Sequence, residues 1–230
     1  MSEKQSSLMR RGRPPRSKMQ HAVEREAIIS AARKLFKSEG YEGISMRKIA
    51  SHVGCSVSAI YIFFQNKRQI FHVFWESVFL DLAKQVACSY NNAAPSGRIE
   101  AMSLTYINFW LDRPDDFRSI FLVEDKPEAM SEGYFVDHSA AVPELSIFHR
   151  AIAEAQIREE IIPGDPEDLK NILLCAFHGI ALNLLTIPEY PWGHHDRIRD
   201  HMVRILLAGM AQSPQKPAIR NRQNIKKKET

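Results

Sequence analysis

The stretch Ser45–Lys67, SMRKIASHVGCSVSAIYIFFQNK, decides the fold of the N-terminal part of this chain. Ser45 suits the N-cap of a helix, because the apolar residues that follow it recur at helical spacing. Gly54 supplies the left-handed residue that commonly ends a helix. Ser56 can then cap a second helix, which turns Ile60 inward. The sequence therefore predicts two short helices that cross closely at a tight turn.

Two helices joined in this way form a helix-turn-helix, whose second helix normally enters the major groove of DNA. The second helix has small polar residues on the side away from Ile60, Phe63 and Phe64, and basic residues surround the unit. An ordinary helical hairpin is the alternative, since Ala50 and Gly54 are common residue types where helices cross. We expect the DNA-binding unit, because basic surroundings suit a polyanion.

The charge of the chain is divided unevenly along its 230 residues. Residues 1–20 and residues 213–230 each hold six Lys or Arg against one Glu, and residues 21–70 carry a net charge of +4. Residues 71–212 carry a net charge of −10. This division predicts a polyanionic partner for the basic N-terminal part and a different role for the acidic part.

Composition and periodicity predict an all-α protein. The 44% hydrophobic and 25% charged side chains are typical of a globular protein. The expected regions are a disordered basic arm (1–20), a helix-turn-helix DNA-binding domain (21–70), a helical effector-binding and dimerisation domain (71–212) and a disordered basic tail (213–230). We find no signal peptide or membrane-spanning run, so we expect a cytoplasmic, nucleoid-associated protein without a membrane partner.

The basic arm contains RRGRPPR over residues 10–16, which is similar to the core of an AT-hook. Such a flat Gly-Arg-Pro unit fits its arginines into a narrow A·T minor groove. We expect Arg10, Arg11 and Arg13 to contact DNA. A solvated tail is the alternative. The position of the arm just before the helix-turn-helix favours the DNA contact.

Two further helices complete the N-terminal prediction. A helix from Ala22 to about Ser38 carries an apolar stripe and makes the unit three-helical. Asn66 can cap a fourth helix, with Gln69 at the reciprocal capping position. The apolar pattern of this fourth helix continues to Val86, so it joins the basic unit to the acidic part.

The run EREAIISAARKLFKSEGYEGISMRKIASHVGCSVSAIYIFFQNKRQIF (residues 24–71) resembles the N-terminal domain of the TetR family of transcriptional regulators. The resemblance implies a homodimer that binds a palindromic double-stranded DNA operator with one three-helix unit per half-site. It also implies two groups of DNA contacts in and around the second helix of the helix-turn-helix: one group binds phosphates and the other meets the edges of bases. The phosphate group is Ser45, Arg47, Tyr61 and Lys67; the base-edge group is Val57, Ser58 and Ala59, with Ser56 at the start of the same helix.

Two positions depart from the family pattern. Many relatives have Gly or a polar residue at position 58 and His at position 62, where this chain has Ser58 and Ile62. Because Ile cannot donate a hydrogen bond, one contact is missing or replaced by an apolar contact with a thymine methyl group. The operator sequence is therefore not transferable from the family. For Tyr61, a core aromatic is the alternative to a phosphate contact.

The second half reads as a series of helices. Residues 91–97 are a loop by composition, and Asp165 and Pro166 supply a cap and a first-turn proline for a long apolar helix that ends before Pro188. Other helices are expected around residues 99–113, 115–121, 145–152 and 198–206, whereas residues 124–142 lack a clear period. The last two helices are more apolar than one buried face requires, which favours a homodimer interface.

The segments YINFWLDRPDDFRSIF and AFHGIALNLL weakly resemble the C-terminal domain of the TetR-family branch with a Trp-His-Gly signature, with Phe177 where Trp is usual. This resemblance implies a pocket for a small-molecule effector, whose identity the sequence does not give. The lining expected by position is Phe109, Trp110, Phe117, Phe121, Phe148, Phe177 and His178. Aromatic residues at helical spacing are otherwise plain core, and His178 is then a core histidine bonded to a backbone carbonyl.

Enzymatic and metal-binding interpretations are disfavoured. Cys175 and His178 are one helical turn apart, but no glycine-rich turn, paired carboxylate or nucleophile elbow accompanies them. Cys175 is therefore expected to be inert packing. His194, His195, Asp196 and His201 have no known ligand spacing. We expect no enzyme, no metal and no cofactor.

The sequence thus predicts a DNA-binding regulator, a repressor released from its operator by a small-molecule effector. The alternative is an effector-independent architectural or protein-recruiting DNA-binding protein. A cavity of several hundred cubic ångströms in the second domain would favour the first, and a filled core the second. Whether the output is repression or activation stays open.

Overall fold

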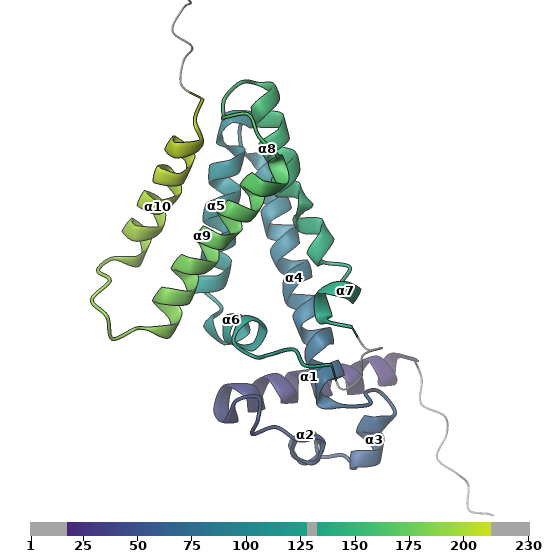
Figure 1. The fold of residues 1–230 in the computed structure, drawn as a ribbon. Coiled ribbons are helices and arrows are strands. Elements are labelled where there is room, and N and C mark those ends of the chain that lie inside the picture. The colour runs from purple at the N-terminus through teal and green to yellow at the C-terminus, as the bar shows by residue number, and fades with distance from the viewer. Residues whose placement is uncertain (1–17, 128–132, 213–230) are drawn as a thin grey trace, which may run out of the picture. The chain divides into compact units, whose positions relative to one another are not determined.

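The computed structural model describes residues 18–127 and 133–212, and within them every regular element is a helix (Figure 1). The all-α prediction is confirmed. The chain divides into two compact units. One, which we call the N-terminal unit, comprises the chain up to Trp75 together with residues 119–128; the other, the C-terminal unit, comprises residues 76–118 and the chain from 129 onward. The division therefore falls a few residues after the boundary predicted from the sequence.

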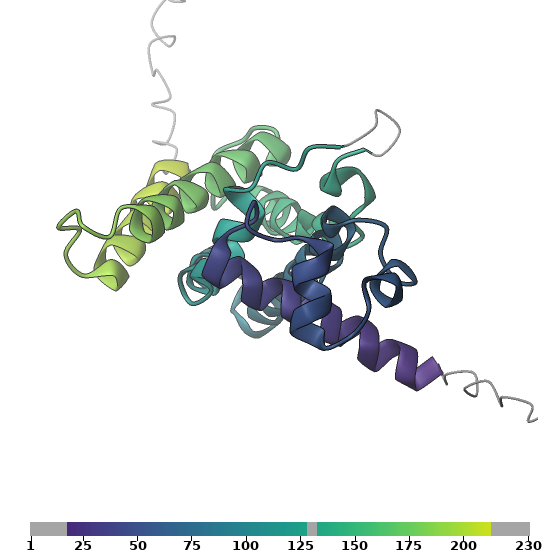
Figure 2. The same cartoon turned by 90° about the horizontal axis from the view of Figure 1, so that it is seen from below.

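The N-terminal unit contains α1 (Lys18–Glu39), α2 (Met46–Val53), α3 (Val57–Tyr61) and the beginning of α4 (Lys67–Asn92). Figure 2 shows α1 as the long helix of this unit; α2 packs against α1, and α3 packs against α2. Its first turn lies inside the range that the sequence assigned to the basic arm, and Arg10, Arg11 and Arg13 lie outside the described residues. The core of the unit is made of apolar side chains from all four helices: Ile28, Ala32, Leu35, Ile49, Ala50, Ile60, Ile70 and Phe71.

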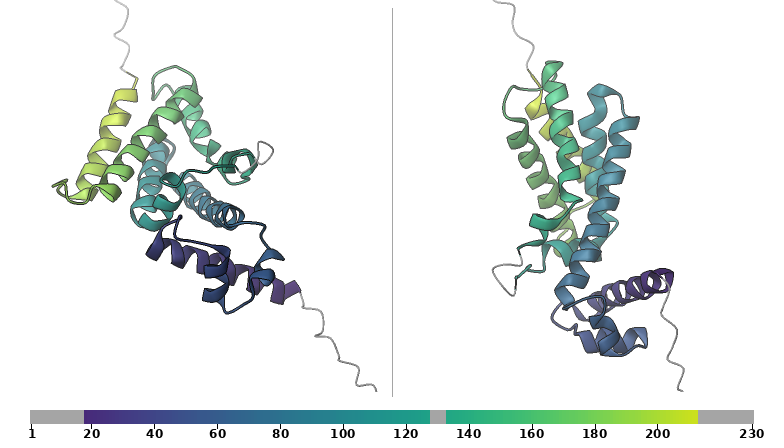
Figure 3. Two further views of the ribbon diagram at one scale, coloured as in Figure 1. Left: turned by 60° about the horizontal axis from the view of Figure 1, so that its bottom comes forward. Right: turned by 90° about the vertical axis from the view of Figure 1, so that its right-hand side faces the viewer.

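The C-terminal unit is a helical bundle. After α4 it contains η1 (Pro95–Gly97), α5 (Arg98–Leu111), α6 (Pro114–Phe121), α7 (Phe135–His138), η2 (Val142–Ser146), α8 (Ile147–Ile157), α9 (Pro166–Thr186) and α10 (His195–Met210). The helices α5, α8 and α9 pack on one another, and α10 packs on α5 and α9. Figure 3 shows α9 and α10 running side by side. Asp165 caps α9 by accepting a hydrogen bond from the Glu167 amide, as predicted.

Three sequence-based expectations about this unit are wrong in detail. The predicted loop over residues 91–97 instead contains the last two residues of α4 and the short helix η1, because α4 continues through Asn92. The segment without a clear period, residues 124–142, contains the short helix α7 and the first residue of η2. Cys175 is exposed rather than packed, because it lies on the outer face of α9.

Within the described ranges, α9 is long and apolar enough to meet the length and composition requirements of a membrane span, with a mean hydropathy of 1.4. Its inner face packs into the core through Leu173, Phe177 and Ile180. Its outer face adds the exposed side chains of Ile172 and Leu182. A helix used on both faces by protein contacts has this composition without a membrane.

Candidate nucleic-acid interface and effector site

The helix-turn-helix is built by caps that the sequence encodes. Ser45 accepts a hydrogen bond from the amide of Lys48 (3.3 Å), which satisfies one free donor in the first turn of α2. Gly54 ends α2 with φ of 76°, and its amide donates to the Ala50 carbonyl at 2.9 Å. Only glycine adopts this left-handed conformation without strain, so the turn between α2 and α3 depends on it.

The start of α3 is fixed by two serines. Ser56 accepts a hydrogen bond from the Ala59 amide at 3.2 Å, and its hydroxyl lies 2.9 Å from the hydroxyl of Ser58. Ser58 is exposed while its hydroxyl is already oriented by this neighbour. The hydroxyl of this predicted base-edge residue thus lies within hydrogen-bond distance of a protein partner.

The end of α3 has buried and exposed side chains next to one another. Ile60 is fully buried, whereas the Tyr61 and Ile62 side chains are 55% and 65% exposed. The core alternative for Tyr61 is therefore wrong. The helix itself ends at Tyr61, so Phe63 and Phe64 follow it in a turn rather than on the helix. Phe64 is buried, and Phe63 is half-buried.

Lys67 is already engaged in the structure. Its ammonium donates a hydrogen bond to the Tyr41 carbonyl at 3.0 Å and lies 4.1 Å from the centre of the Tyr41 ring. It also lies 3.8 Å from a carboxylate oxygen of Glu42. These contacts tie the first turn of α4 to the loop between α1 and α2. A DNA phosphate would have to share or replace them.

The first turn of α4 has the predicted cap in a shifted form. Asn66 accepts a hydrogen bond from the Gln69 amide at 2.9 Å. The Gln69 side chain reaches back to the amide of Gln65, at 2.8 Å. Two donors at the helix start are satisfied in this way, with the reciprocal bond one residue earlier than expected.

The predicted DNA-binding residues within the described chain lie at or near the surface. Ser45, Arg47, Ser56, Ser58 and Tyr61 are exposed, and Val57, Ala59 and Lys67 are half-buried. One face of α2 and one face of α3 are buried in the core. The exposed side chains therefore lie on the outer faces of these two helices and in the segments next to them. The arrangement is compatible with an α3 inserted in a DNA groove and phosphate contacts on either side.

Residues 28–73, which cover most of α1 through the start of α4, match the family model described as "Bacterial regulatory proteins, tetR family". A curated relative, an HTH-type transcriptional repressor AcnR from Corynebacterium diphtheriae, is 32% identical over 90 residues. Residues 28–73 therefore form a DNA-binding domain of the TetR-family type. The match to AcnR spans 39% of this chain and 43% of that repressor.

Solved structures agree with the fold of the chain as a whole. A protein of unknown function from Rhodococcus sp. RHA1 has a TM-score of 0.69 at 22% identity, over 90% of this chain and 100% of that one. A TetR/AcrR-family regulator from Thermobifida fusca has a TM-score of 0.62 at 24% identity, over 81% of this chain and 98% of that one. At these identities the likeness shows the fold alone.

The N-terminal unit also includes a clamp that the sequence did not suggest. The carboxylate of Asp125 lies 2.6 Å from Nε of Arg68 and 2.9 Å from Nε2 of His72. Arg68 is one of the few buried charged residues in the described chain. The pairing explains why residues 119–128 belong to this unit, although they follow it by some 40 positions in the sequence. No periodic signal marks Asp125.

The residues predicted to line the effector pocket form a packed aromatic cluster in the C-terminal unit. The Tyr106 ring contacts those of Trp110, Phe148, Phe177 and His178 at centroid distances between 5.7 and 6.2 Å. Phe109 and Phe117 join through Trp110. Phe121 is instead assigned to the N-terminal unit. The sequence thus identified a real cluster, and its role in ligand binding stays a prediction.

His178 has a specific partner in this cluster. Its Nε2 lies 2.5 Å from the Tyr106 hydroxyl. Burial lowers the pKa of His178 and raises the pKa of Tyr106 well above its ordinary value. The imidazole is therefore neutral near pH 7, and its Nε2 accepts a hydrogen bond from the tyrosine hydroxyl. For His178 as a core histidine, the sequence suggested a hydrogen bond to a backbone carbonyl; the structure gives its Nε2 the side chain of Tyr106 as a partner.

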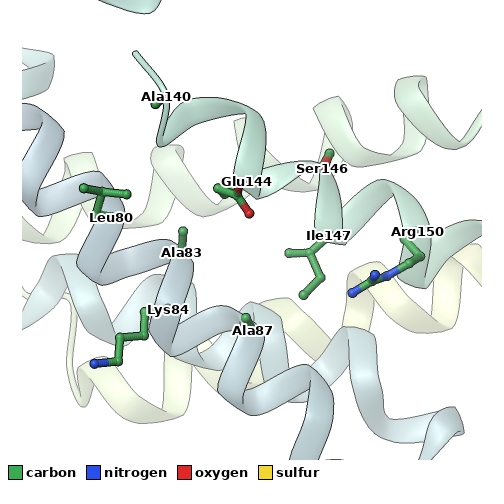
Figure 4. Close-up of a pocket in the computed structure, with 9 residues that line it drawn as sticks. All are labelled: Leu80, Ala83, Lys84, Ala87, Ala140, Glu144, Ser146, Ile147 and Arg150. Atoms are coloured by element: carbon green, nitrogen blue, oxygen red, sulfur yellow. The ribbon is translucent and has the colours of Figure 1, made fainter.

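A groove of about 550 Å³ lies elsewhere in the C-terminal unit, between α4 and the segment that leads from η2 into α8 (Figure 4). Its lining contains small, apolar and charged side chains: Leu80, Ala83, Lys84, Ala87, Ala140, Glu144, Ser146, Ile147 and Arg150. Sequence reasoning looked for aromatic residues and so missed it. Alanines on two segments far apart in the chain give no signal until the fold brings them together.

Metal binding has no geometric support in the parts of the chain that the structure describes. No group of three or more His, Cys, Asp or Glu side chains there could hold an ion. The three cysteines are free thiols. The candidate sites are therefore an exposed nucleic-acid interface, a packed aromatic cluster and a surface groove.

Proposed function

We propose that this chain is a DNA-binding transcriptional regulator, a homodimeric repressor that a small-molecule effector releases from a palindromic operator. One observation carries the proposal: a TetR-family helix-turn-helix keeps the exposed Ser58 and Tyr61 on and at the end of α3, over a fully buried Ile60. Such a regulator acts in the bacterial cytoplasm, on the nucleoid.

The contacts follow from exposure and chemistry. Ser45, Arg47 and Tyr61 offer donors to phosphate oxygens on either side of α3. Val57, Ser58 and Ala59 meet the base edges, and the exposed Ile62 contacts a thymine methyl group. Lys67 supplies a phosphate contact only after exchanging its bond with the Tyr41 carbonyl. Arg10, Arg11 and Arg13 of the arm add contacts in an A·T-rich minor groove.

Dimerisation is supported by apolar side chains on α9 and α10. Ile205 on α10 is 71% exposed, and Ile172 on α9 is 55% exposed. Pairing of two copies would remove this surface from water, at about 25 cal/mol per Å² of apolar area. A dimer presents two copies of α3 to successive major grooves, about 34 Å apart or a multiple of that spacing.

An effector is supported by the groove of about 550 Å³ in the C-terminal unit, since small-molecule sites commonly enclose about 300–1,000 Å³. An effector can shift the equilibrium between DNA-competent and released states only by its differential affinity for them. This cavity favours the sensor over the second candidate, an effector-independent architectural or protein-recruiting DNA-binding protein.

Fluorescence anisotropy of labelled DNA from beside the gene, with a random duplex as competitor, tests the proposal. We expect specific binding by the full-length protein, which Arg47→Ala weakens on both DNAs and which Arg197→Ala, on exposed α10, leaves unchanged. Binding no tighter than to random DNA across a library of genomic fragments would refute sequence-specific regulation. Specific binding that no member of a broad compound panel releases would favour the effector-independent candidate.

A further inference from the structure

We propose that the groove between α4 and the η2–α8 segment binds a small zwitterion with an ammonium at one end, a carboxylate at the other and an apolar linker between them. Glu144 and Arg150 face the groove from the same wall, six residues apart. Binding at this site is a property of the C-terminal unit alone, whereas its service as the effector site rests on the proposed function.

The floor of the groove suits an apolar linker. Ala83 and Ile147 are each 8% exposed, and Ala87 is half-buried between them and solvent. Ala83 and Ala87 on α4 have small side chains, so the space between α4 and the opposite wall stays open. Methylene groups laid on this floor leave water at a gain of about 0.8 kcal/mol per fully buried group.

The wall that carries Glu144 is held to α4 by hydrogen bonds. The carboxylate of Glu76 on α4 accepts bonds from the Ser139 hydroxyl (2.6 Å), the Ala140 amide (3.1 Å) and the Ala141 amide (3.0 Å). These bonds fix the chain directly before η2. The groove is therefore pre-organised, and a ligand does not have to order its wall.

The positive end of the groove is Arg150. Its guanidinium lies 4.6 Å from the centre of the Tyr90 ring, and in Figure 4 it extends toward Ile147. The nearby carboxylate of Glu154 already accepts bonds from the Tyr90 hydroxyl (2.6 Å) and from Arg98 (2.8 Å). The hydrogen bond from Tyr90 lowers the pKa of Glu154, and the positive charge of Arg150 adds to this effect. Among the described residues no carboxylate lies within the 4.0 Å ion-pair distance of Arg150, so its guanidinium can donate hydrogen bonds to a ligand carboxylate.

The negative end is Glu144, near Leu80 and Ala140. Its carboxylate has no cation within ion-pair distance in the described part of the chain. Lys84 is the third charged residue of the lining, and its side chain turns away from Arg150 in Figure 4. A simple anion would meet Glu144 and a simple cation would meet Arg150, so the zwitterion is the class that finds an opposite charge at both ends.

The length of the ligand follows from the wall. Glu144 is in η2 and Arg150 is in α8, so their Cα atoms are separated by about 10 Å along the two helices. We propose that the ligand matches this backbone spacing, which an ω-amino acid with a chain of about eight carbons does, whereas a four-carbon analogue is about half as long.

Saturation-transfer NMR titration of the full-length protein tests the proposal with four probes: 8-aminooctanoate, octanoate, octylamine and 4-aminobutyrate. We expect saturable binding of 8-aminooctanoate, about threefold or more tighter than either single-charge probe, and no binding of 4-aminobutyrate. Equal affinities for the three eight-carbon probes would overturn the charge assignment, and no saturable binding of 8-aminooctanoate would overturn the site.

Matched variants locate the site. Glu144→Gln should weaken 8-aminooctanoate and octylamine but not octanoate; Arg150→Gln should weaken 8-aminooctanoate and octanoate but not octylamine. Ala87→Phe should abolish binding of all three by filling the groove, whereas Arg197→Gln should change nothing. Unaltered binding in a folded Ala87→Phe protein would place the ligand elsewhere and overturn the proposal.

A separate readout isolates the effector role. Adding saturating 8-aminooctanoate to the protein–DNA complex should lower the anisotropy signal in the wild type and not in Ala87→Phe. NMR binding without release of DNA would leave the site standing and remove its assignment as the effector site.

Discussion

The hydroxyl of Tyr106 on α5 lies 2.5 Å from Nε2 of His178 on α9, inside a cluster of aromatic rings. The two residues are 72 positions apart in the sequence, and this bond is a polar link between the buried faces of α5 and α9. Burial keeps both groups neutral near pH 7, because it lowers the pKa of His178 and raises the pKa of Tyr106.

The stability of the protein should fall in mild acid because of His178. Its pKa is lowered in the folded state from an ordinary value near 6.5, so below pH 6.5 the unfolded chain binds more protons. The stabilising contribution is complete above pH 6.5 and is lost as the pH falls toward the lower folded pKa. Urea unfolding at a series of pH values should show a smaller decline in His178→Gln than in wild type, with the exposed His201→Gln as control. An equal decline in all three proteins would contradict the assignment.

Asp125 should contribute more to stability than its neighbour Glu124. Asp125→Asn leaves the buried Arg68 without its carboxylate, at an expected loss of about 2 kcal/mol or more of unfolding free energy. Glu124 pairs only with Lys126, and both side chains are 73% exposed. Glu124→Gln should therefore change the unfolding free energy by less than about 0.5 kcal/mol. Equal effects in denaturant unfolding would show that the clamp is not a structural element.

Gly54 should tolerate alanine poorly for a backbone reason. Its φ is 76°, and a Cβ at this position would meet no neighbouring atom, so the cost is conformational strain of about 1–2 kcal/mol. Gly97 is the matched control, since its added Cβ also meets open space while φ is −98°. We expect Gly97→Ala to be neutral or slightly stabilising in thermal unfolding. A similar loss at both positions would contradict backbone strain as the cause of the cost at Gly54.

Replacing Lys67 should affect both DNA binding and the loop before α2. Lys67→Ala should weaken specific and random DNA alike and reduce the slope of log affinity against log salt by about one unit. Because Lys67 also bonds to the Tyr41 carbonyl, hydrogen exchange at residues 40–44 should quicken. Lys84→Ala removes the same charge from the C-terminal unit and should leave the salt slope unchanged. A faster-exchanging loop with an unaltered slope would make Lys67 structural only.

Dimerisation should depend on Ile205 rather than on exposed apolar residues in general. Ile205→Glu should raise the dissociation constant of the dimer by about tenfold or more, because each copy would bury a charge at the interface. Sedimentation velocity would show this change as a larger monomer fraction. Ile157 at the end of α8 is 82% exposed and serves as control. If Ile157→Glu dissociates the dimer and Ile205→Glu does not, the interface lies on α8.

Local sequence determined the elements that depend on neighbours in the chain. Ser45, Gly54, Ser56 and Asp165 act as caps or stops where they were expected, because a cap bond joins residues two to four positions apart. The aromatic cluster was also identified, since its members follow the helical period. Boundaries were less secure: α1 begins before the predicted start, and α4 continues through the predicted loop.

Tertiary structure alone decided the contacts between distant segments. The pairing of Asp125 with Arg68, the bond of Lys67 to Tyr41 and the meeting of Ala83 with Ile147 in one groove leave no periodic trace in the sequence. Apolar stripes can be recognised from residue spacing because an α-helix repeats every 3.6 residues, and caps can be recognised because they involve near neighbours in the chain. Which charged side chain finds which partner, and where small residues leave a groove, depends instead on how helices pack, and packing is a property of the whole folded unit.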